Sequence, residues 1–304
     1  LRKDRPTKGV PIFPLGNPFD LGMTIVEGTH QGIDESLIYR WLLFSGAINS
    51  GMSGGPAVDA EGQVVGVSRA AGGEDIGFLV PAERLQALRE RVAKRGYQPP
   101  DSFDAVIGRQ LKGHQAKYME KVLSGEWSTY ELGPARVPVE LAAFLDCTGE
   151  SDSDDDEFYY EVQRGCGTSY EIKLSSGHET GDISYQATAY SSDKLGPQRF
   201  YNYYEHDFDP GYGIDGEEEE VTEFICRSRL VRASGTTWKT VFCARRYKRF
   251  EELYDAYMVL ASVGAKDRGV IVKAGLRGVV RNNAERFAER LIDTVQWNSS
   301  SSKP

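Results

Sequence analysis

Short apolar runs separated by glycine-rich turns fill the first quarter of the chain. Alternating runs of this length are typical of antiparallel strands, so we expect a small barrel or sandwich. The acidic turn at 59–62 joins two of the runs and predicts a tight hairpin. The expected strands are 10–15, 23–27, 37–44, 55–58, 64–68 and 76–81.

Two helices are expected after the last of these strands. Leu85, Leu88 and Val92 recur at helical spacing behind Pro81, and a second helical pattern covers 103–123. Gly96 and the proline pair at 99–100 lie between them. We therefore predict one domain over residues 1–98 and another over 99–304.

The second domain is predicted to be α+β. Apolar residues repeat at i, i+3 and i+4 from Phe250 to Ala261 and again from Ala284 to Val295, which predicts two closing helices. The chain as a whole is therefore expected to be mainly β with α. The strands expected here are 136–145, 157–163, 169–174, 183–190, 200–204, 221–229 and 237–245.

Composition and charge narrow the function classes. The chain has 304 residues, of which 40% are hydrophobic and 27% charged, which excludes wholesale disorder. It has no uninterrupted apolar run of about 18 residues, so no membrane partner is expected. Residues 151–220 hold 4 basic and 18 acidic side chains, and residues 221–304 hold 16 basic and 8 acidic ones. Because the basic end follows an acidic region, no nucleic-acid partner is expected.

Cysteines and carboxylates suggest no metal or cofactor. The acidic stretch 207–220 has carboxylates at calcium-loop spacing, but Tyr212 stands where a glycine is required, so a solvated loop is favoured. The cysteines are too far apart for a zinc motif and would pair in an oxidising compartment. Buried free thiols are the favoured interpretation. With no apolar secretory segment at the start, a cytoplasmic location is expected. The cysteines are Cys147, Cys166, Cys226 and Cys243.

The strongest chemical signal is the segment Ala-Ile-Asn-Ser-Gly-Met-Ser-Gly-Gly-Pro at 47–56. Ser53 lies among glycines, which allow a tight backbone turn. Such a turn brings a serine Oγ and the N–H groups of Gly51 and Ser53 toward one carbonyl, as an acyl-transfer nucleophile and its oxyanion hole require. Turns rich in glycine and serine are common, so the motif alone is only moderately specific.

Three sequence blocks give the segment a context. They are Leu-Gly-Asn-Pro-Phe at 15–19, the serine segment at 48–56, and Gly-Gln-Val-Val-Gly-Val at 62–67 followed by Ile-Gly-Phe-Leu-Val-Pro at 76–81. In this order they resemble the trypsin-like (chymotrypsin-fold) serine peptidases of the HtrA/Deg type. The resemblance covers residues 8–95 and only the second of that family's two barrels. It implies a chymotrypsin-like antiparallel barrel half and a serine endopeptidase that forms an acyl-enzyme on Ser53.

The resemblance also implies that part of the catalytic machinery lies elsewhere. The family takes its catalytic His and Asp from the first barrel, which would precede Leu1. We expect that barrel to be a cleaved or missing segment and a partner of this chain. The alternative is a catalytically inactive trypsin-like scaffold that acts as a protein-binding or regulatory module. No histidine of the chain occupies a family position: His30, His114, His178 and His206.

Substrate-binding residues are expected on both sides of the serine. Trypsin has an acidic residue six positions before its nucleophile, and here that position is Ala47, followed by Ile48, so a small or medium apolar residue is expected at the cleaved position. The substrate is a protein or peptide that pairs with the edge formed by Val67, Ser68, Arg69 and Ala70. Residues 99–304 do not resemble the family's PDZ domains and are expected to bind a regulator or recruit substrate.

Overall fold

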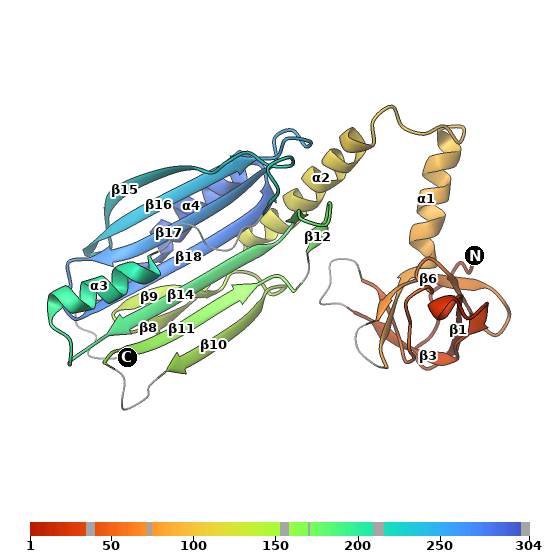
Figure 1. The fold of residues 1–304 in the computed structure, drawn as a ribbon, viewed down its shortest axis with the longest axis horizontal. Helices are drawn as coiled ribbons and strands as arrows, with labels where there is room; N and C mark the ends of the chain where they lie inside the picture. The colour runs from red at the N-terminus through yellow and green to blue at the C-terminus, as the bar shows by residue number, and fades with distance from the viewer. Residues whose placement is uncertain (35–39, 72–74, 153–157, 170, 209–215, 299–304) are drawn as a thin grey trace. The chain divides into compact units, whose positions relative to one another are not determined.

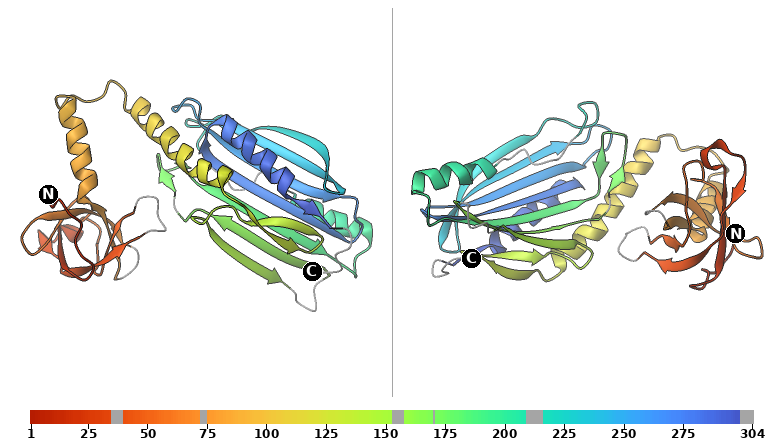
Figure 2. Two further views of the ribbon diagram at one scale, coloured as in Figure 1. Left: turned by 180° about the vertical axis from the view of Figure 1, so that it is seen from behind. Right: turned by 60° about the horizontal axis from the view of Figure 1, so that its bottom comes forward.

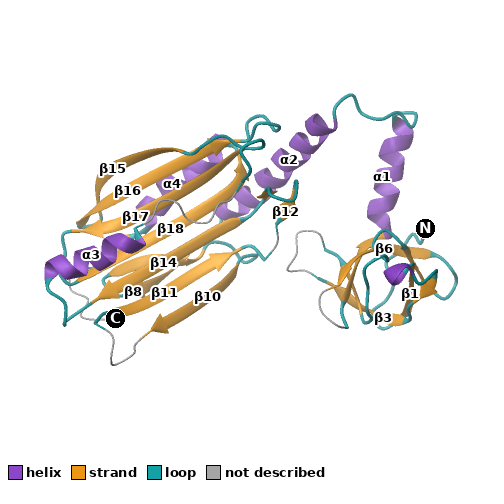
Figure 3. Ribbon diagram, in the orientation of Figure 1, coloured by secondary structure: helices purple, strands orange, loops and turns teal. Residues whose placement is uncertain are grey.

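Two separate antiparallel sheets organise the chain, one in each of the units Leu1–Asp101 and Ser102–Pro304 (Figure 1). The computed structural model describes residues 1–304 except 35–39, 72–74, 153–157, 170, 209–215 and 299–304. Strands outweigh helices in both units, so the mainly β fold class with additional helices is confirmed (Figure 3). Among the described helices, none is both long and apolar enough to cross a membrane.

The first unit is a closed barrel. Its strands are ordered β2-β1-β3-β4-β7-β6-β5, and pairing of β1 with β5 closes a ring of six strands. The interior is filled by apolar side chains such as Ile12, Phe44 and Leu79, each with 0% exposure. The elements are β1 (Pro11–Gly16), β2 (Thr24–Ile25), β3 (Gly28–Ile33), β4 (Leu42–Phe44), β5 (Pro56–Val58), β6 (Val64–Ala71), β7 (Gly77–Pro81), the short 3-10 helix Pro18–Asp20 and the helix α1 (Ala82–Lys94).

The second unit is built on a sheet of seven strands in the order β10-β11-β14-β18-β17-β16-β15, each antiparallel to its neighbour. The strands are β10 (Asp146–Asp152), β11 (Tyr160–Gly167), β14 (Ile183–Ser191), β15 (Ile225–Ala233), β16 (Thr236–Arg246), β17 (Tyr254–Val263) and β18 (Arg268–Val279).

Helices cover both faces of this sheet (Figure 2). The helices α2 (Phe103–Ser124) and α4 (Arg281–Thr294) pack on one face together with a small sheet, and α3 (Pro197–Asp207) packs on the other. We call these the α4 face and the α3 face. The remaining strands are β8 (Ser128–Leu132), β9 (Ala135–Glu140) and β19 (Gln296–Trp297) of the small sheet and the pair β12 (Ile172–Lys173) and β13 (Glu179–Thr180).

The helix predicted from Phe250 to Ala261 is wrong, because residues 254–261 of this segment belong to the strand β17. β17 lies between β16 and β18, and its residues 255–262 are all buried. A strand that is covered on both faces needs apolar residues at consecutive positions, and such a run also satisfies a helical repeat. The strand predicted at 200–204 is wrong as well, because α3 covers it. Pro197 occupies its first turn, and Phe200 and Tyr204 point at the sheet one helical turn apart.

Free thiols were the favoured interpretation of the sequence, but all four cysteines form disulfide bonds. Cys147 is bonded to Cys166 across β10 and β11, and Cys226 is bonded to Cys243 across β15 and β16. Each pair occupies directly opposite positions in its ladder, so the side chains meet without any rearrangement of the strands. Both bonds secure an edge strand, because β10 and β15 are the two ends of the sheet.

Reduction is therefore expected to destabilise the second unit and leave the barrel unit unchanged. Each bond joins residues 19 or 17 positions apart, and closing a loop of this size in the unfolded chain contributes about 3 kcal/mol. The test is urea unfolding with and without dithiothreitol. Pulse proteolysis along the urea series, with the fragments identified by mass spectrometry, follows the two units separately, because Trp127, Trp238 and Trp297 of the second unit would mask the fluorescence of Trp41. Equal shifts of both transitions, or no shift, would contradict the expectation.

Candidate active site

Ser53 lies at the tip of the loop between β4 and β5, and its neighbours fix the loop in the barrel. The side chain of Met52 is fully buried in the barrel core, while Ser53 itself is exposed. Gly51 has φ +96° and Gly54 has φ +85°, in the left-handed region that favours glycine. The Met52 N–H donates to Asn49 O at 3.0 Å, which closes the turn in front of the serine.

A second turn packs directly against this loop. The Asn17 N–H donates to Gly51 O at 3.4 Å, and the Phe19 N–H donates to Ser50 O at 3.1 Å. A Cβ on Gly51 would lie 2.2 Å from Asn17 O, so the two backbones meet at a distance that only glycine permits. The Asn17 side chain also closes its own turn by accepting from the Gly22 N–H at 2.7 Å. Asn17 was not predicted as a site residue, and its signal was the Gly-Asn-Pro block.

Within the described loop, the N–H groups of residues 46–51 and of Ser53 have no hydrogen-bond partner. The N–H groups of Met52, Gly54 and Gly55 donate to backbone carbonyls at 2.7–3.0 Å. The N–H groups of Gly51 and Ser53 have no partner among the described residues. These are the two groups that the sequence pattern assigned to an oxyanion hole. The N–H group of Met52, which lies between them, is bonded inside the loop.

The Ser53 hydroxyl is bonded to the backbone. Its Oγ donates to Arg69 O at 2.8 Å, and within the described barrel unit no imidazole is hydrogen-bonded to it. His30 is 4% exposed in β3, and neither of its ring nitrogens has a hydrogen-bond partner in that part of the structure.

The other histidines belong to the second unit. His114 lies in α2 and His206 in α3. His178 Nδ1 lies 2.8 Å from Glu220 Oε2, and burial lowers the pKa of His178 and of His114 below the usual range of a histidine.

The expected substrate residues have different environments. Ala47 is half-buried at the entrance to the loop, whereas Ile48 is 4% exposed and packs in the barrel core. Val67 is paired on both sides, with Pro56 and with Val80. Ser68 is buried, and its backbone is bonded to Gly54 and Gly55.

Beyond Ser68, the described part of β6 has no pairing with β5. A bulge at Arg69 separates Ser68 from Ala70 in the ladder with β7, where Ala70 pairs with Phe78. The exposed Arg69 guanidinium lies over the Trp41 ring, 4.1 Å from its centroid. Trp41 was not predicted either, because only the strand order of the barrel brings it beside Arg69. The backbone edge open to another strand thus begins at Arg69.

The acidic segment 207–220 falls partly outside the described residues, because 209–215 are not among them. Asp207 itself accepts from Lys273 Nζ at 2.7 Å and from the Tyr190 hydroxyl at 2.6 Å, so it has a structural role. In the parts of the chain that the structure describes, no group of three or more His, Cys, Asp or Glu side chains is arranged to hold a metal ion.

Replacing Gly51 with Ala is expected to destabilise the barrel unit more than the same change at Gly54. Both residues have positive φ, but a Cβ at Gly54 meets nothing within 4 Å, so Gly54→Ala should cost only about 1 kcal/mol. Gly51→Ala also has to push Asn17 away, and a cost of at least twice that amount is expected. Urea unfolding followed by pulse proteolysis, with fragments of the barrel unit identified by mass spectrometry, measures both. Equal midpoints for the two variants would show that the contact with Asn17 contributes nothing.

Comparison with known proteins identifies relatives of this part of the chain. The family model of the trypsin-like peptidase domain matches residues 1–67. The periplasmic serine endoprotease DegP of Escherichia coli (strain K12) is 28% identical over 116 residues, which cover 35% of this chain and 24% of that protein. The putative serine protease HhoB of Synechocystis sp. is 30% identical over 106 residues, which cover 31% of this chain and 25% of that protein.

Solved structures of the same kind are similar over a comparable stretch. The HtrA-type protease AlgW with a tripeptide is 28% identical and covers 30% of this chain and 33% of that one, with a TM-score of 0.28. The serine endoprotease from Yersinia pestis is 27% identical and covers 31% and 34%, also with a TM-score of 0.28. The chain spans about a quarter of the length of the curated relatives that it matches.

These relatives overturn the expected cytoplasmic location. Several are named as periplasmic serine endoproteases, and both disulfide bonds agree with an oxidising compartment. The sequence argument failed because it treated the cysteines as free and took the first residues as a guide to targeting. Residues 1–67 thus match the trypsin-like peptidase domain, and the first part of the chain is similar to serine proteases of the HtrA type.

Proposed function

We propose that this chain supplies the nucleophile and the oxyanion hole of a serine endopeptidase. The observation that carries the proposal is the pair of N–H groups at Gly51 and Ser53, which lie on either side of the bonded Met52 N–H and lack a partner in the described structure. An oxyanion hole needs N–H groups that are held in place and are not bonded to another acceptor of the protein, and these two groups meet both conditions. The similarity to serine endoproteases over the same residues supports the proposal.

The mechanism follows from these groups. Ser53 Oγ leaves Arg69 O, gives its proton to a general base and attacks the substrate carbonyl. The negative oxygen that results accepts hydrogen bonds from the Gly51 and Ser53 N–H groups, and collapse of the intermediate releases the amine and leaves an acyl-enzyme on Ser53. Water then attacks the acyl carbonyl and restores the serine. The base and its carboxylate partner would come from a first barrel outside this sequence.

The substrate would be an extended stretch of a protein or peptide. Its backbone would pair with β6 from Arg69 onward, where β5 no longer occupies the edge. Ala47, which is small and uncharged, favours a small or medium apolar residue at the cleaved position. A location outside the cytoplasm, such as the periplasm, fits both the disulfides and the relatives. The second unit would act as an accessory module for regulation or substrate recruitment.

A second function is a trypsin-like scaffold without catalysis, which binds protein partners or regulates them. The bond from Ser53 Oγ to Arg69 O favours it, because a serine held by a backbone carbonyl is not activated. In this function the serine loop would be retained for the tight packing of Gly51 on Asn17.

Labelling of Ser53 separates the two functions. The full-length protein, with any segment encoded before Leu1, is treated with a fluorophosphonate probe and the labelled peptide is identified by mass spectrometry. We expect the label on Ser53, and we expect Ser53→Ala to lower peptide hydrolysis by about 10⁴-fold or more.

Ser50 provides the matched control, since it is an exposed serine in the same loop. Ser50→Ala should keep both the label and the activity. A folded full-length protein that takes up no label would support the scaffold and reject the peptidase.

A further inference from the structure

The two edges of the large sheet carry opposite charges. β15 contains Arg227, Arg229 and Arg232 and no acidic residue, whereas β10 contains Asp146, Glu150 and Asp152 and no basic one. In the described structure each of these strands pairs with one neighbour only, β15 with β16 and β10 with β11. Residues 225–230 and 146–150 are all exposed, so both backbone edges are open to another strand.

We propose that the second unit associates with a second copy of this chain by pairing β15 of one copy with β10 of the next. The occupant of the basic edge is thus the acidic edge of a second copy of this chain. The charges, the strand direction and the faces of the sheet all favour this arrangement, and they do so independently of the serine site.

The faces of the sheet determine the orientation of the second copy. Directly opposite residues of neighbouring strands lie on the same face of the sheet. One such row includes Arg227 of β15 and lies on the α4 face: Cys147, Cys166, Tyr185, Ala274, Met258, Phe242 and Arg227. Since side chains alternate along a strand, Arg227 and Arg229 point to the α4 face, and Asp146 and Glu150 point to the α3 face. The opposite charges therefore meet only if the second copy is turned over.

Turning the second copy over also sets the strand direction. The sheet has six antiparallel steps from β10 to β15, so these two strands run in the same direction within one copy. A copy that is rotated about an axis in the sheet, perpendicular to the strands, exchanges its faces and reverses its strands. β10 then runs antiparallel to β15, which is the more stable pairing. One rotation satisfies both requirements.

Pairing of like edges is disfavoured. Two β15 strands would bring arginines together, and two β10 strands would bring carboxylates together, which is destabilising in directly opposed cross-strand positions. A symmetric dimer through either edge is thereby excluded. Pairing of unlike edges leaves one basic and one acidic edge free on every pair, so the association continues beyond the dimer.

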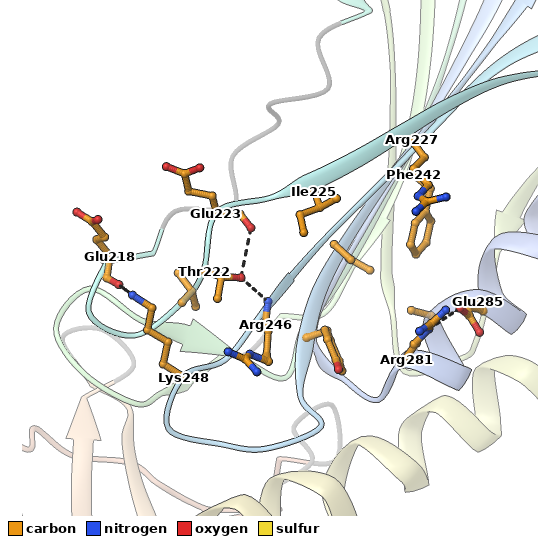
Figure 4. Close-up of a pocket in the computed structure, with 15 residues that line it drawn as sticks. Glu218, Thr222, Glu223, Ile225, Arg227, Phe242, Arg246, Lys248, Arg281 and Glu285 are labelled. Atoms are coloured by element: carbon orange, nitrogen blue, oxygen red, sulfur yellow. Dashed lines mark hydrogen bonds and ion pairs between the residues drawn. The ribbon is translucent and has the colours of Figure 1, made fainter.

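A cavity lies beside β15, and one arginine of this strand, Arg227, points into it (Figure 4). The cavity has a volume of about 1000 Å³ and lies between β15, β16, β17 and α4, with Phe242 on its floor. Arg227 and Arg246 line it, and neither guanidinium has an acidic partner among the described residues. Arg281, by contrast, is paired with Glu285 at 2.7 Å. Carboxylates from a neighbouring β10 on this face would supply partners for Arg227 and Arg229.

Sedimentation velocity of the full chain under non-reducing conditions tests the proposal. At about 0.05 M salt the weight-average mass should rise beyond that of a dimer as the protein concentration increases, and at about 0.5 M salt it should return to the monomer. A monomer at all concentrations in low salt would overturn the proposal.

Charge reversal makes the test specific. Arg227→Glu with Arg229→Glu makes both edges acidic, and Asp146→Arg with Glu150→Arg makes both basic. Each variant alone should be monomeric, and an equimolar mixture should associate again, because every contact then joins an acidic edge to a basic one.

The matched control is Arg89→Glu with Arg91→Glu, which makes the same charge change on exposed positions of α1. This variant should associate like the wild type. If the control abolishes association as well, or if the mixture stays monomeric, pairing of β15 with β10 is refuted. Circular dichroism of each variant verifies that the sheet is intact.

Discussion

The shape of the serine site depends on one contact between two stretches of backbone, at Gly51 and Asn17. A carbonyl oxygen occupies the place where a side chain of Gly51 would begin, so the two turns approach as closely as main chains allow. Met52 fixes the other side of the loop in the barrel core. Both sides of the loop are thus fixed. In the resulting backbone conformation the N–H groups of Gly51 and Ser53 have no partner within the described structure. Main-chain packing, more than any side chain, thus determines the site.

The second unit depends on a different constraint, because its sheet packs against core side chains on both faces while residues 146–150 and 225–230 of its two edge strands are exposed. Strand exchange or fraying begins at such edges. The protein secures each one covalently, with Cys147–Cys166 on the α4 face and Cys226–Cys243 on the α3 face. These bonds keep β10 and β15 in register with their neighbours, so the charges along each edge stay in fixed positions. Rigid edges are a requirement for selective pairing.

The barrel was largely predictable from the sequence because each strand has one face in the core and one in solvent, which produces alternation. The exception is β3, whose sequence Gly-Thr-His-Gln-Gly-Ile has few apolar residues, and its pairing with β1 and β4 comes from the closure of the barrel. In the second unit the prediction failed where tertiary structure overrides local pattern. β17 is buried on both faces, and α3 has aromatic residues that favour strands in isolation. The disulfides could not be predicted, since the pairing of cysteines follows strand register.

The sequence identified the serine loop but not the hydrogen bond that the Ser53 hydroxyl makes, because only the strand order of the barrel brings Arg69 O beside Ser53. This bond joins the proposed nucleophile to the edge at which a substrate strand would be added. A single neutral hydrogen bond at an exposed position contributes about 1 kcal/mol, so a nearby imidazole that accepts the same proton would displace it at little cost. The N–H groups of Gly51 and Ser53 are fixed by glycine geometry and packing. They could bind an acceptor without displacing an existing hydrogen bond. In the proposed peptidase the barrel alone would therefore supply the oxyanion side of the site, and an additional segment would have to contribute a base within reach of Oγ.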